Sequence, residues 1–138
     1  MAGYSGTPLA KKLGMKDGSV VSIFHQPEYY FNLFPSLPDN IRFVDDPKIK
    51  KDIIHYFTRS AKQYVKDLPL LRKSIVPNGA IWISWPKKSS GVHSDVDEDF
   101  IRQMAIKNGL VDIKVCAVDE TWSGLKLVIP VKERSFEF

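Results

Sequence analysis

Three short apolar runs, set apart by segments with helical patterns, constrain the fold of this chain more than any other feature. The runs lie at 20–24, 52–57 and 80–85, and in each the apolar residues are largely consecutive rather than alternating. Runs of this kind are typical of strands buried on both faces. Strands that alternate with helices along a chain pair in parallel through right-handed crossovers. The pattern therefore predicts an α/β fold with a doubly wound, mostly parallel sheet.

Two short helical segments are expected in the first part of the chain. A helix is predicted at 8–13, with Thr7 as its cap and Gly14 as its left-handed stop. Residues 28–34 predict a second helical stretch, which Pro35 ends.

Two longer helices are expected after the second and third apolar runs. Ser60 and Gln63 have the capping-box spacing at the start of the first, and Pro69 inside its apolar pattern predicts a break or kink. The second is capped by the Ser or Asp at 94–95 and ended by the Asn-Gly pair at 108–109.

The last part of the chain has the alternating pattern of an antiparallel hairpin. Apolar residues alternate with polar ones at 111–118 and again at 125–131, and the polar segment 119–124 joins the two. In the first strand Val111, Ile113, Val115 and Ala117 are expected to share one face. The second strand is a possible sheet edge that could pair with a second copy of the chain, although Pro130 opposes this.

Length and residue usage bound the class of protein. A chain of 138 residues corresponds to one domain, with an N-terminal helical arm at 1–18, the sheet and helices at 19–131 and a tail at 132–138. The single Cys116 excludes an internal disulfide framework and a Cys-rich zinc site. The absence of a long apolar run and of a secretory signal predicts a cytoplasmic protein without a membrane span, either a monomer or a homodimer.

Charge is unevenly distributed along the chain. Residues 42–73 hold nine Lys and Arg against four Asp and Glu, whereas 95–120 hold seven acids against three bases. Several of these acids precede or begin the last helix, where carboxylates are favourable. The basic segment 42–73 keeps nucleic-acid binding open as an alternative function, and solvated helix faces are the other interpretation.

The middle of the chain resembles a known enzyme family. An apolar strand with an acidic start at 52–57 is followed by a helix and by IVPNGAIWI at 75–83. This order is similar to the second half of class I S-adenosylmethionine-dependent methyltransferases, which have an L-x-P-G-G-x-hydrophobic strand entry and also end in a helix, a strand and an antiparallel hairpin strand. The resemblance implies a Rossmann-like, three-layer domain over about 17–131, S-adenosylmethionine as cofactor and methyl transfer as activity.

The first apolar run departs from that family. In methyltransferases the first strand leads into a glycine-rich loop, where bare backbone approaches the cofactor. Here the strand leads into the sequence HQPE at 25–28, which has no glycine. Pro27 removes a backbone donor, and the other side chains block a close approach.

The region after a short predicted strand at 41–44 is truncated relative to the family. Asp45 or Asp46 could imitate the carboxylate that binds the cofactor ribose, or could be a turn acid before Pro47. Only residues 47–51 separate this pair from the next strand, which is too short for a helical crossover.

Three further segments of the sequence resemble a second family. They are GYSGTPLAKKLG at 3–14, SWPKK at 84–88 and the segment 109–126. Together they are similar to a family of small bacterial proteins that is catalogued only as a domain of unknown function. That resemblance implies relatives and supplies no activity.

Candidate binding residues follow the predicted strands at one edge of the sheet. Ligands of open α/β sheets bind outside the carboxyl ends of the strands. The Arg59 guanidinium can donate two hydrogen bonds to one anion, and Ser60 lies at the N-terminus of a predicted helix, where anions bind. Lys87 and Lys88 add further donors, and Trp85 and Trp122 add flat surfaces for stacking. The pattern predicts a pocket for a small anionic ligand or phosphate, formed by Arg59, Ser60, Trp85, Lys87, Lys88, Ser89, Thr121, Trp122 and Ser123, with His25 and Glu28 as secondary candidates. Alternatively, both tryptophans pack in the core and both lysines point to water.

Catalytic groups are not evident in the sequence. His25, His55 and His93 are far apart and lack metal-ligand spacing, and Cys116 is interpreted as a small packed residue. The sequence therefore predicts a non-enzymatic module without a cofactor, which binds a small anionic ligand or a protein on a truncated methyltransferase-like fold. The alternative is a methyltransferase-like enzyme with a reshaped S-adenosylmethionine site.

Overall fold

One six-stranded sheet organises the protein. The computed structural model describes residues 7–134, and its strands follow the order β2-β1-β3-β4-β6-β5. The strands are β1 (Val20–Phe24), β2 (Arg42–Phe43), β3 (Lys51–Phe57), β4 (Ile75–Pro86), β5 (Val111–Ala117) and β6 (Trp122–Val128). The first four are parallel, whereas β6 is antiparallel to both β4 and β5. The predicted α/β class, mostly parallel with a C-terminal antiparallel pair, is confirmed.

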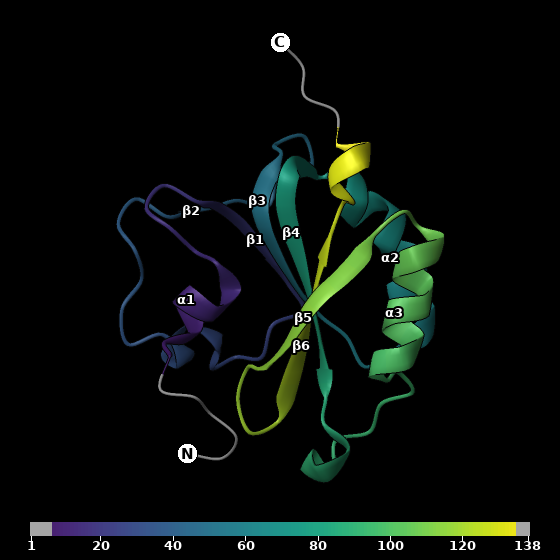
Figure 1. The fold of residues 1–138 in the computed structure, drawn as a ribbon. Helices are drawn as coiled ribbons and strands as arrows, with labels where there is room; N and C mark the ends of the chain where they lie inside the picture. The colour runs from purple at the N-terminus through teal and green to yellow at the C-terminus, as the bar shows by residue number, and fades with distance from the viewer. Residues whose placement is uncertain (1–6, 135–138) are drawn as a thin grey trace.

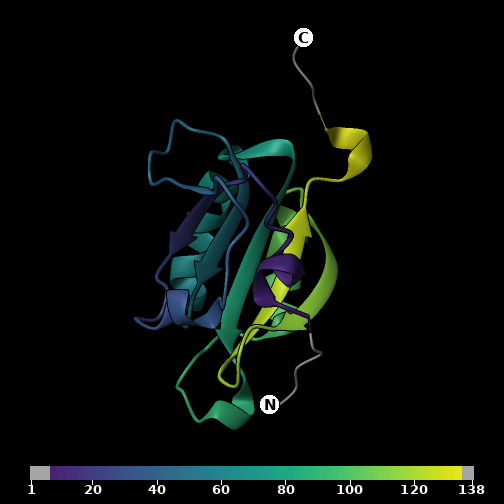
Figure 2. The ribbon, with the colours of Figure 1, turned by 90° about the vertical axis from the view of Figure 1, so that its left-hand side faces the viewer.

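Helices cover both faces of this sheet. The helical elements are α1 (Leu9–Leu13), α2 (Ala61–Lys73) and α3 (Glu98–Lys107), with 3-10 turns η1 (Tyr30–Leu33), η2 (Lys88–Ser90) and η3 (Val131–Glu133). In Figure 1, α1 lies to one side of the sheet and α2 and α3 lie to the other. Figure 2 views the molecule from the α1 side, with α1 in front of the strands. None of the described helices is long and apolar enough to cross a membrane.

Each face of the sheet contributes to its own apolar core. Alternate residues of a strand point to opposite faces, so Ile54 and Tyr56 pack toward α2 and α3, and Ile53 and Phe57 pack toward α1 and η1. All the residues from Ile53 to Phe57 are buried. The consecutive apolar pattern of the second run is thereby explained, because β3 is covered on both sides.

The N-terminal arm matches its prediction in part. Gly14 ends α1 in the left-handed conformation at φ 85°, as expected, but Pro8 rather than Thr7 occupies the N-cap position and no side chain caps it. The predicted helical stretch at 28–34 is the shorter η1. Residues 1–6 of the arm and 135–138 of the tail lie outside the described residues.

The expected break at Pro69 is absent. Helix α2 continues through Pro69 to Lys73, and its buried residues on either side of the proline, Leu68 and Leu71, pack in the core. Pro69 itself is exposed, as is Val65, whose carbonyl loses its usual helical partner. Packing of the buried stripe therefore holds the helix together across the proline.

The start of α3 differs from the prediction because Asp95 is used elsewhere. Asp97 is the N-cap, and its carboxylate accepts a hydrogen bond of 2.9 Å from the Phe100 backbone N–H. The Asp95 carboxylate instead accepts a 2.6 Å bond from the Ala61 N–H at the start of α2. A tertiary contact between two helices therefore moves the helix start by two residues.

The predicted apolar face of β5 is split. A register shift between Asp112 and Lys114 inserts an extra residue into the strand, so Val111 and Val115 point to opposite faces of the sheet. Val111, Ile113 and Val115 are 37%, 53% and 48% exposed. The alternation in the sequence was therefore misleading, because a bulge changes the parity of every residue that follows it.

The sheet edges also differ from the expectation. Strand β6 lies between β4 and β5, so the edges are β2 and β5, and the second hairpin strand cannot pair with another copy. Strand β4 contains a bulge, in which residues 76–79 lie opposite Asp52 alone. Gly79 permits this bulge, because an added Cβ would lie 3.0 Å from the Lys51 carbonyl oxygen.

A buried polar network crosses the centre of the α1 face. His55 is fully buried, with the Tyr30 hydroxyl 3.0 Å from its Nδ1 and the Ser84 hydroxyl 2.8 Å from its Nε2. A neutral imidazole donates at one nitrogen and accepts at the other, which suits one hydroxyl on each side. Burial lowers the pKa of His55 from 6.5 to about 3, so the ring is neutral in the folded protein.

This burial predicts a loss of stability in mild acid. In the unfolded chain His55 titrates at its ordinary pKa, so below pH 6.5 the unfolded state takes up a proton that the folded state excludes until its own pKa of about 3. The free energy of unfolding should therefore fall by about 1.4 kcal/mol per pH unit in this window. Urea unfolding at a series of pH values measures the slope.

Two variants separate His55 from other titrating groups. His55→Gln should be less stable at neutral pH but should lose this slope, whereas His25→Gln, at an exposed position, should keep it. Imidazole nitrogen shifts that show a protonated His55 in folded protein at pH 5 would contradict the assignment.

Candidate ligand-binding cleft

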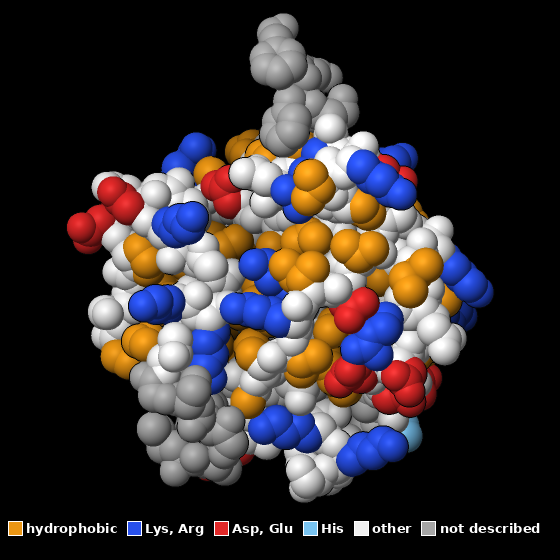
Figure 3. Space-filling view, viewed as in Figure 1, with side chains coloured by type: hydrophobic (Ala, Val, Ile, Leu, Met, Phe, Trp, Pro, Cys, Tyr) orange, Lys and Arg blue, Asp and Glu red, His pale blue; other side chains and the backbone are white. Residues whose placement is uncertain are grey.

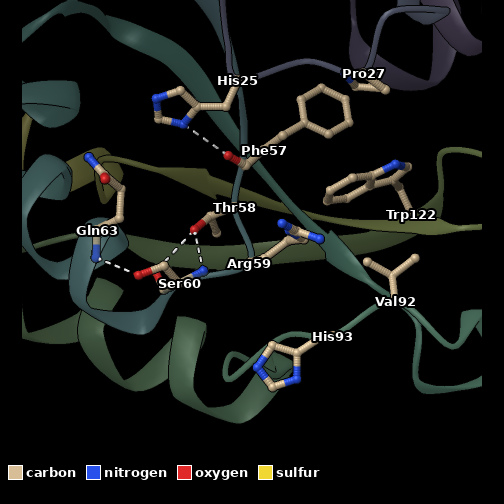
Figure 4. Close-up of a pocket in the computed structure, with 10 residues that line it drawn as sticks. All are labelled: His25, Pro27, Phe57, Thr58, Arg59, Ser60, Gln63, Val92, His93 and Trp122. Atoms are coloured by element: carbon tan, nitrogen blue, oxygen red, sulfur yellow. Dashed lines mark hydrogen bonds between the residues drawn. The ribbon is translucent and has the colours of Figure 1, made fainter.

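A cleft of about 500 Å³ opens at the carboxyl edge of the sheet, between the ends of β1 and β3. From β1 the chain passes to β2 on one side, and from β3 it passes to β4 on the other. This is a topological switch point, where open α/β sheets bind ligands. The cleft is lined by His25, Pro27, Phe57, Thr58, Arg59, Ser60, Gln63, Val92, His93 and Trp122 (Figure 4).

His25 forms the turn that follows β1. Its φ of 57° lies in the left-handed region, which non-glycine residues rarely adopt. Its Nδ1 donates a 3.2 Å hydrogen bond to the Phe57 carbonyl, and its ring packs edge-on against Tyr56 at 5.2 Å. The side chain thus bridges the ends of β1 and β3 at the position where methyltransferases are expected to have a bare glycine turn.

The segment after β3 is held by a chain of local hydrogen bonds. The Thr58 N–H donates to the Ser84 carbonyl at 2.9 Å, and the Ser60 N–H donates to the Thr58 hydroxyl at 3.1 Å. The Ser60 hydroxyl in turn accepts from the Gln63 N–H at 3.1 Å, which confirms Ser60 as the cap of α2. These hydrogen bonds fix the backbone on both sides of Arg59, so the starting position of its side chain is well defined.

The anion site predicted at the start of α2 already holds a carboxylate of this chain. Asp95 accepts from the Ala61 N–H, and its own N–H donates to the Arg59 carbonyl at 3.2 Å. The positive end of the helix thus stabilises Asp95. Binding of an external anion in the cleft would therefore depend mainly on the Arg59 side chain.

Arg59 lies exposed in the middle of the cleft. Figure 4 shows its guanidinium turned toward Phe57 and Trp122, with His25 and His93 on opposite sides. Every ion pair within residues 7–134 involves Arg102 on α3, so no described carboxylate pairs with Arg59. The lining residues include no Asp or Glu.

The tip of the β5–β6 hairpin supplies an aromatic wall. Buried Asp119 accepts 2.8 Å and 2.7 Å hydrogen bonds from the backbone N–H groups of Thr121 and Trp122, and a 2.8 Å bond from the Tyr29 hydroxyl. The Trp122 ring meets Phe57 edge-on at 5.0 Å. Asp119 therefore joins the segment after β1 to the hairpin tip and positions Trp122.

The structure brings together only part of the predicted set. Arg59, Ser60, Trp122 and the secondary candidate His25 line the cleft. Trp85 is 7% exposed and packs in the core beneath α2 and α3. The remaining candidates, Lys87, Lys88, Ser89, Thr121, Ser123 and Glu28, lie outside the lining residues.

Some lining residues were not identified from the sequence. The sequence pattern identifies Phe57 only as a strand residue and Gln63 only as part of a capping box. Val92 and His93 come from the loop between η2 and α3, which has no periodicity to place it. The one signal for Val92 and His93 is that they follow β4, which is parallel to β3 and ends at the same edge of the sheet.

The acidic pair after β2 does not reach the cleft. Val44 donates to the Val21 carbonyl at 2.9 Å, so β2 runs beside only the first half of β1. The Lys51 ammonium, at the start of β3, then donates to the Asp46 carbonyl at 2.8 Å. Asp45 and Asp46 therefore lie toward the opposite edge, and neither is a lining residue.

Two other functional predictions can be placed in the structure. The basic segment 42–73 is distributed over β2, β3 and α2; its Lys51 is buried, whereas Lys50, Arg72 and Lys73 line one hollow. Within the described part of the chain, no three His, Cys, Asp or Glu side chains lie close enough together to hold a metal ion.

Comparison with known proteins shows the fold. No protein-family model matches the sequence, and no curated protein sequence matches it. The small bacterial family of unknown function therefore stays a prediction.

Solved structures similar to this fold include methyltransferases, some of them named as dependent on S-adenosylmethionine (SAM) or solved with it bound. A SAM-dependent methyltransferase from Aquifex aeolicus has a TM-score of 0.66 at 13% identity, over 88% of each chain. The ribosomal protein L11 methylase from Lactobacillus delbrueckii subsp. bulgaricus has 0.57 at 12%, over 88% of this chain and 74% of that one. Magnesium protoporphyrin IX methyltransferase from Synechocystis PCC 6803 with bound SAM has 0.54 at 11%, with the same coverage.

The Asp119 contacts predict a specific loss of stability. Asp119→Ala should reduce the free energy of unfolding by about 1–3 kcal/mol, because two backbone donors and the Tyr29 hydroxyl lose their acceptor. Asp119→Asn should cost less, since its amide oxygen still accepts. Urea unfolding measures both, and an equal loss in Glu120→Ala, at the exposed neighbouring position, would contradict the assignment.

Proposed function

We propose that this protein binds a small anionic ligand with a planar ring, of the nucleotide class, in the cleft between His25, Arg59 and Trp122. The observation that carries the proposal is an arginine without a carboxylate partner among the described residues, beside an aromatic wall at the switch point of the sheet. An arginine fork suits phosphate or carboxylate, and an indole offers a flat apolar surface for a ring.

The size and polarity of the cleft support a ligand of this class. A volume of about 500 Å³ is in the range of small-molecule sites. The Thr58 and Ser60 hydroxyls and the Gln63 amide surround the charged group, although all three already have intramolecular partners. Binding would therefore depend on Arg59 and on stacking.

The cleft residues support binding rather than catalysis. The His25 Nδ1 is engaged by a backbone carbonyl, and the one cysteine, Cys116, lies outside the cleft. Burial raises the pKa of the Cys116 thiol despite the nearby charges of Lys12 and Lys114, so the reactive thiolate is disfavoured.

SAM-dependent methyl transfer is the second candidate. The likeness to solved methyltransferases, some with bound SAM, favours it. The residues at this edge do not form the cradle that the resemblance implies: His25 and Pro27 stand where bare backbone is expected, and the acidic pair lies elsewhere. The sulfonium of SAM is positively charged, and Arg59 would repel it. The demethylated product lacks that charge and is the better probe of the same shape.

A ligand panel tests both candidates. Isothermal titration with adenosine monophosphate, SAM and its homocysteine product should show the nucleotide binding more tightly than SAM. Arg59→Gln should weaken nucleotide binding roughly 10- to 100-fold, since charge-assisted hydrogen bonds contribute about 1.5–3 kcal/mol. Lys88→Gln, an exposed substitution outside the cleft, should leave binding unchanged.

Each other outcome has a defined meaning. Tighter binding of SAM or its product than of any nucleotide would overturn the first candidate and favour the methyltransferase. An effect of Lys88→Gln equal to that of Arg59→Gln would place the ligand outside the cleft.

A further inference from the structure

Five lysines from three separate segments gather on one face of the molecule. Figure 3 shows Lys and Arg side chains between α1 and the β5–β6 pair. We call this set the lysine face, and it consists of Lys11, Lys12, Lys16, Lys114 and Lys126. It is separate from the cleft and from the basic segment of the sequence.

Lys114 and Lys126 form an unfavourable pair at the centre of this face. They are direct cross-strand partners in the β5–β6 hairpin, where like charges destabilise a sheet. The pKa of Lys126 is lowered, first by partial burial and then by repulsion from Lys114 and Lys16. Three positive charges are thus held close enough to act on one another.

The lysines extend from this pair in both directions. On one side, Lys12 and Lys114 both act on the Cys116 thiol, and they line a hollow of about 540 Å³ together with Lys11. On the other side, Lys16 lines a second hollow with Lys126. The lysines therefore lie one after another across the face and do not surround a single point.

The acids nearest the row have other roles. Asp52 accepts a 2.8 Å hydrogen bond from the Val20 N–H, and Asp17 accepts a 3.0 Å bond from Asn40. Within residues 7–134, Lys16, Lys114 and Lys126 form no ion pair. Asp17 and Asp52 line one hollow with Lys16 and Lys126, but no described carboxylate lies in ion-pair contact with these lysines or with Lys114. A bound polyanion would supply such contacts.

We propose that the lysine face binds the phosphate backbone of a nucleic acid. A row of separated cations suits a chain of regularly repeated charges better than it suits a single small anion. The net charge of +4 favours approach of such a partner. Trp82 is buried beneath Lys114, whose ammonium lies 5.9 Å from the ring centroid. Bases would find no exposed ring among the described residues of this face, so we expect binding to be independent of sequence.

Salt dependence of binding tests this proposal. Fluorescence anisotropy with labelled single strands of about 20 nucleotides should give a slope of log K against log salt of about −3, which is a loss of about 60-fold between about 50 and 200 mM salt. Two strands of unrelated sequence should bind equally. A duplex of the same length distinguishes single-stranded from double-stranded partners.

A matched pair of double variants locates the site. Lys114→Gln with Lys126→Gln should weaken binding and reduce the slope by about 1.4, because two phosphate contacts are lost. Lys62→Gln with Lys66→Gln removes the same charge from exposed positions of α2 and should change the slope little. Without nucleic acid, the first double variant should melt no lower than wild type, because a repulsive pair has been removed.

Three results would overturn the proposal. They are no binding at low salt, an equal loss of slope in both double variants, and self-association of wild type by light scattering that the first double variant abolishes. The last result would instead identify the lysine face as an interface between copies of the chain.

Discussion

Burial of β3 on both faces is the constraint on which the rest of the structure depends. Its side chains alternate between two cores, so both an α2–α3 layer and an α1–η1 layer are needed to remove them from water. A strand buried in this way cannot tolerate an unpartnered polar group. His55 is therefore matched by Tyr30 from η1 and Ser84 from β4, and this requirement ties the irregular segment after β1 to the centre of the sheet.

The end of β3 also determines where ligand chemistry can occur. Beyond Phe57 the backbone turns out of the sheet, and Thr58 and Ser60 fix it by hydrogen bonds so that Arg59 projects into the cleft. The turn at His25 and the hairpin tip at Asp119 close the other sides. Three segments that follow strands thus form one surface, because parallel strands end at the same edge.

The methyltransferase-like fold and the residues at its ligand-binding edge favour different functions. The order of strands and layers is similar to that of solved SAM-dependent methyltransferases, while the turn after β1 and the acids after β2 depart from the expected cradle. A fold places a site without choosing its chemistry. The proposed function therefore rests on Arg59 and Trp122 and not on the likeness.

Local patterns in the sequence were sufficient for the α/β class, the Ser60 cap and the glycine that ends α1, because periodicity and capping involve residues within a few positions of one another. They were insufficient wherever a distant segment intervened. Asp95 serves α2 rather than α3, a bulge reverses the parity of β5, and Trp85 faces the core while Trp122 faces the cleft. The lysine face joins residues about a hundred positions apart, with Lys12 beside Ala117. Hydrogen bonds, strand register and charge proximity between such residues exist only once the sheet has formed, so no window of sequence contains them.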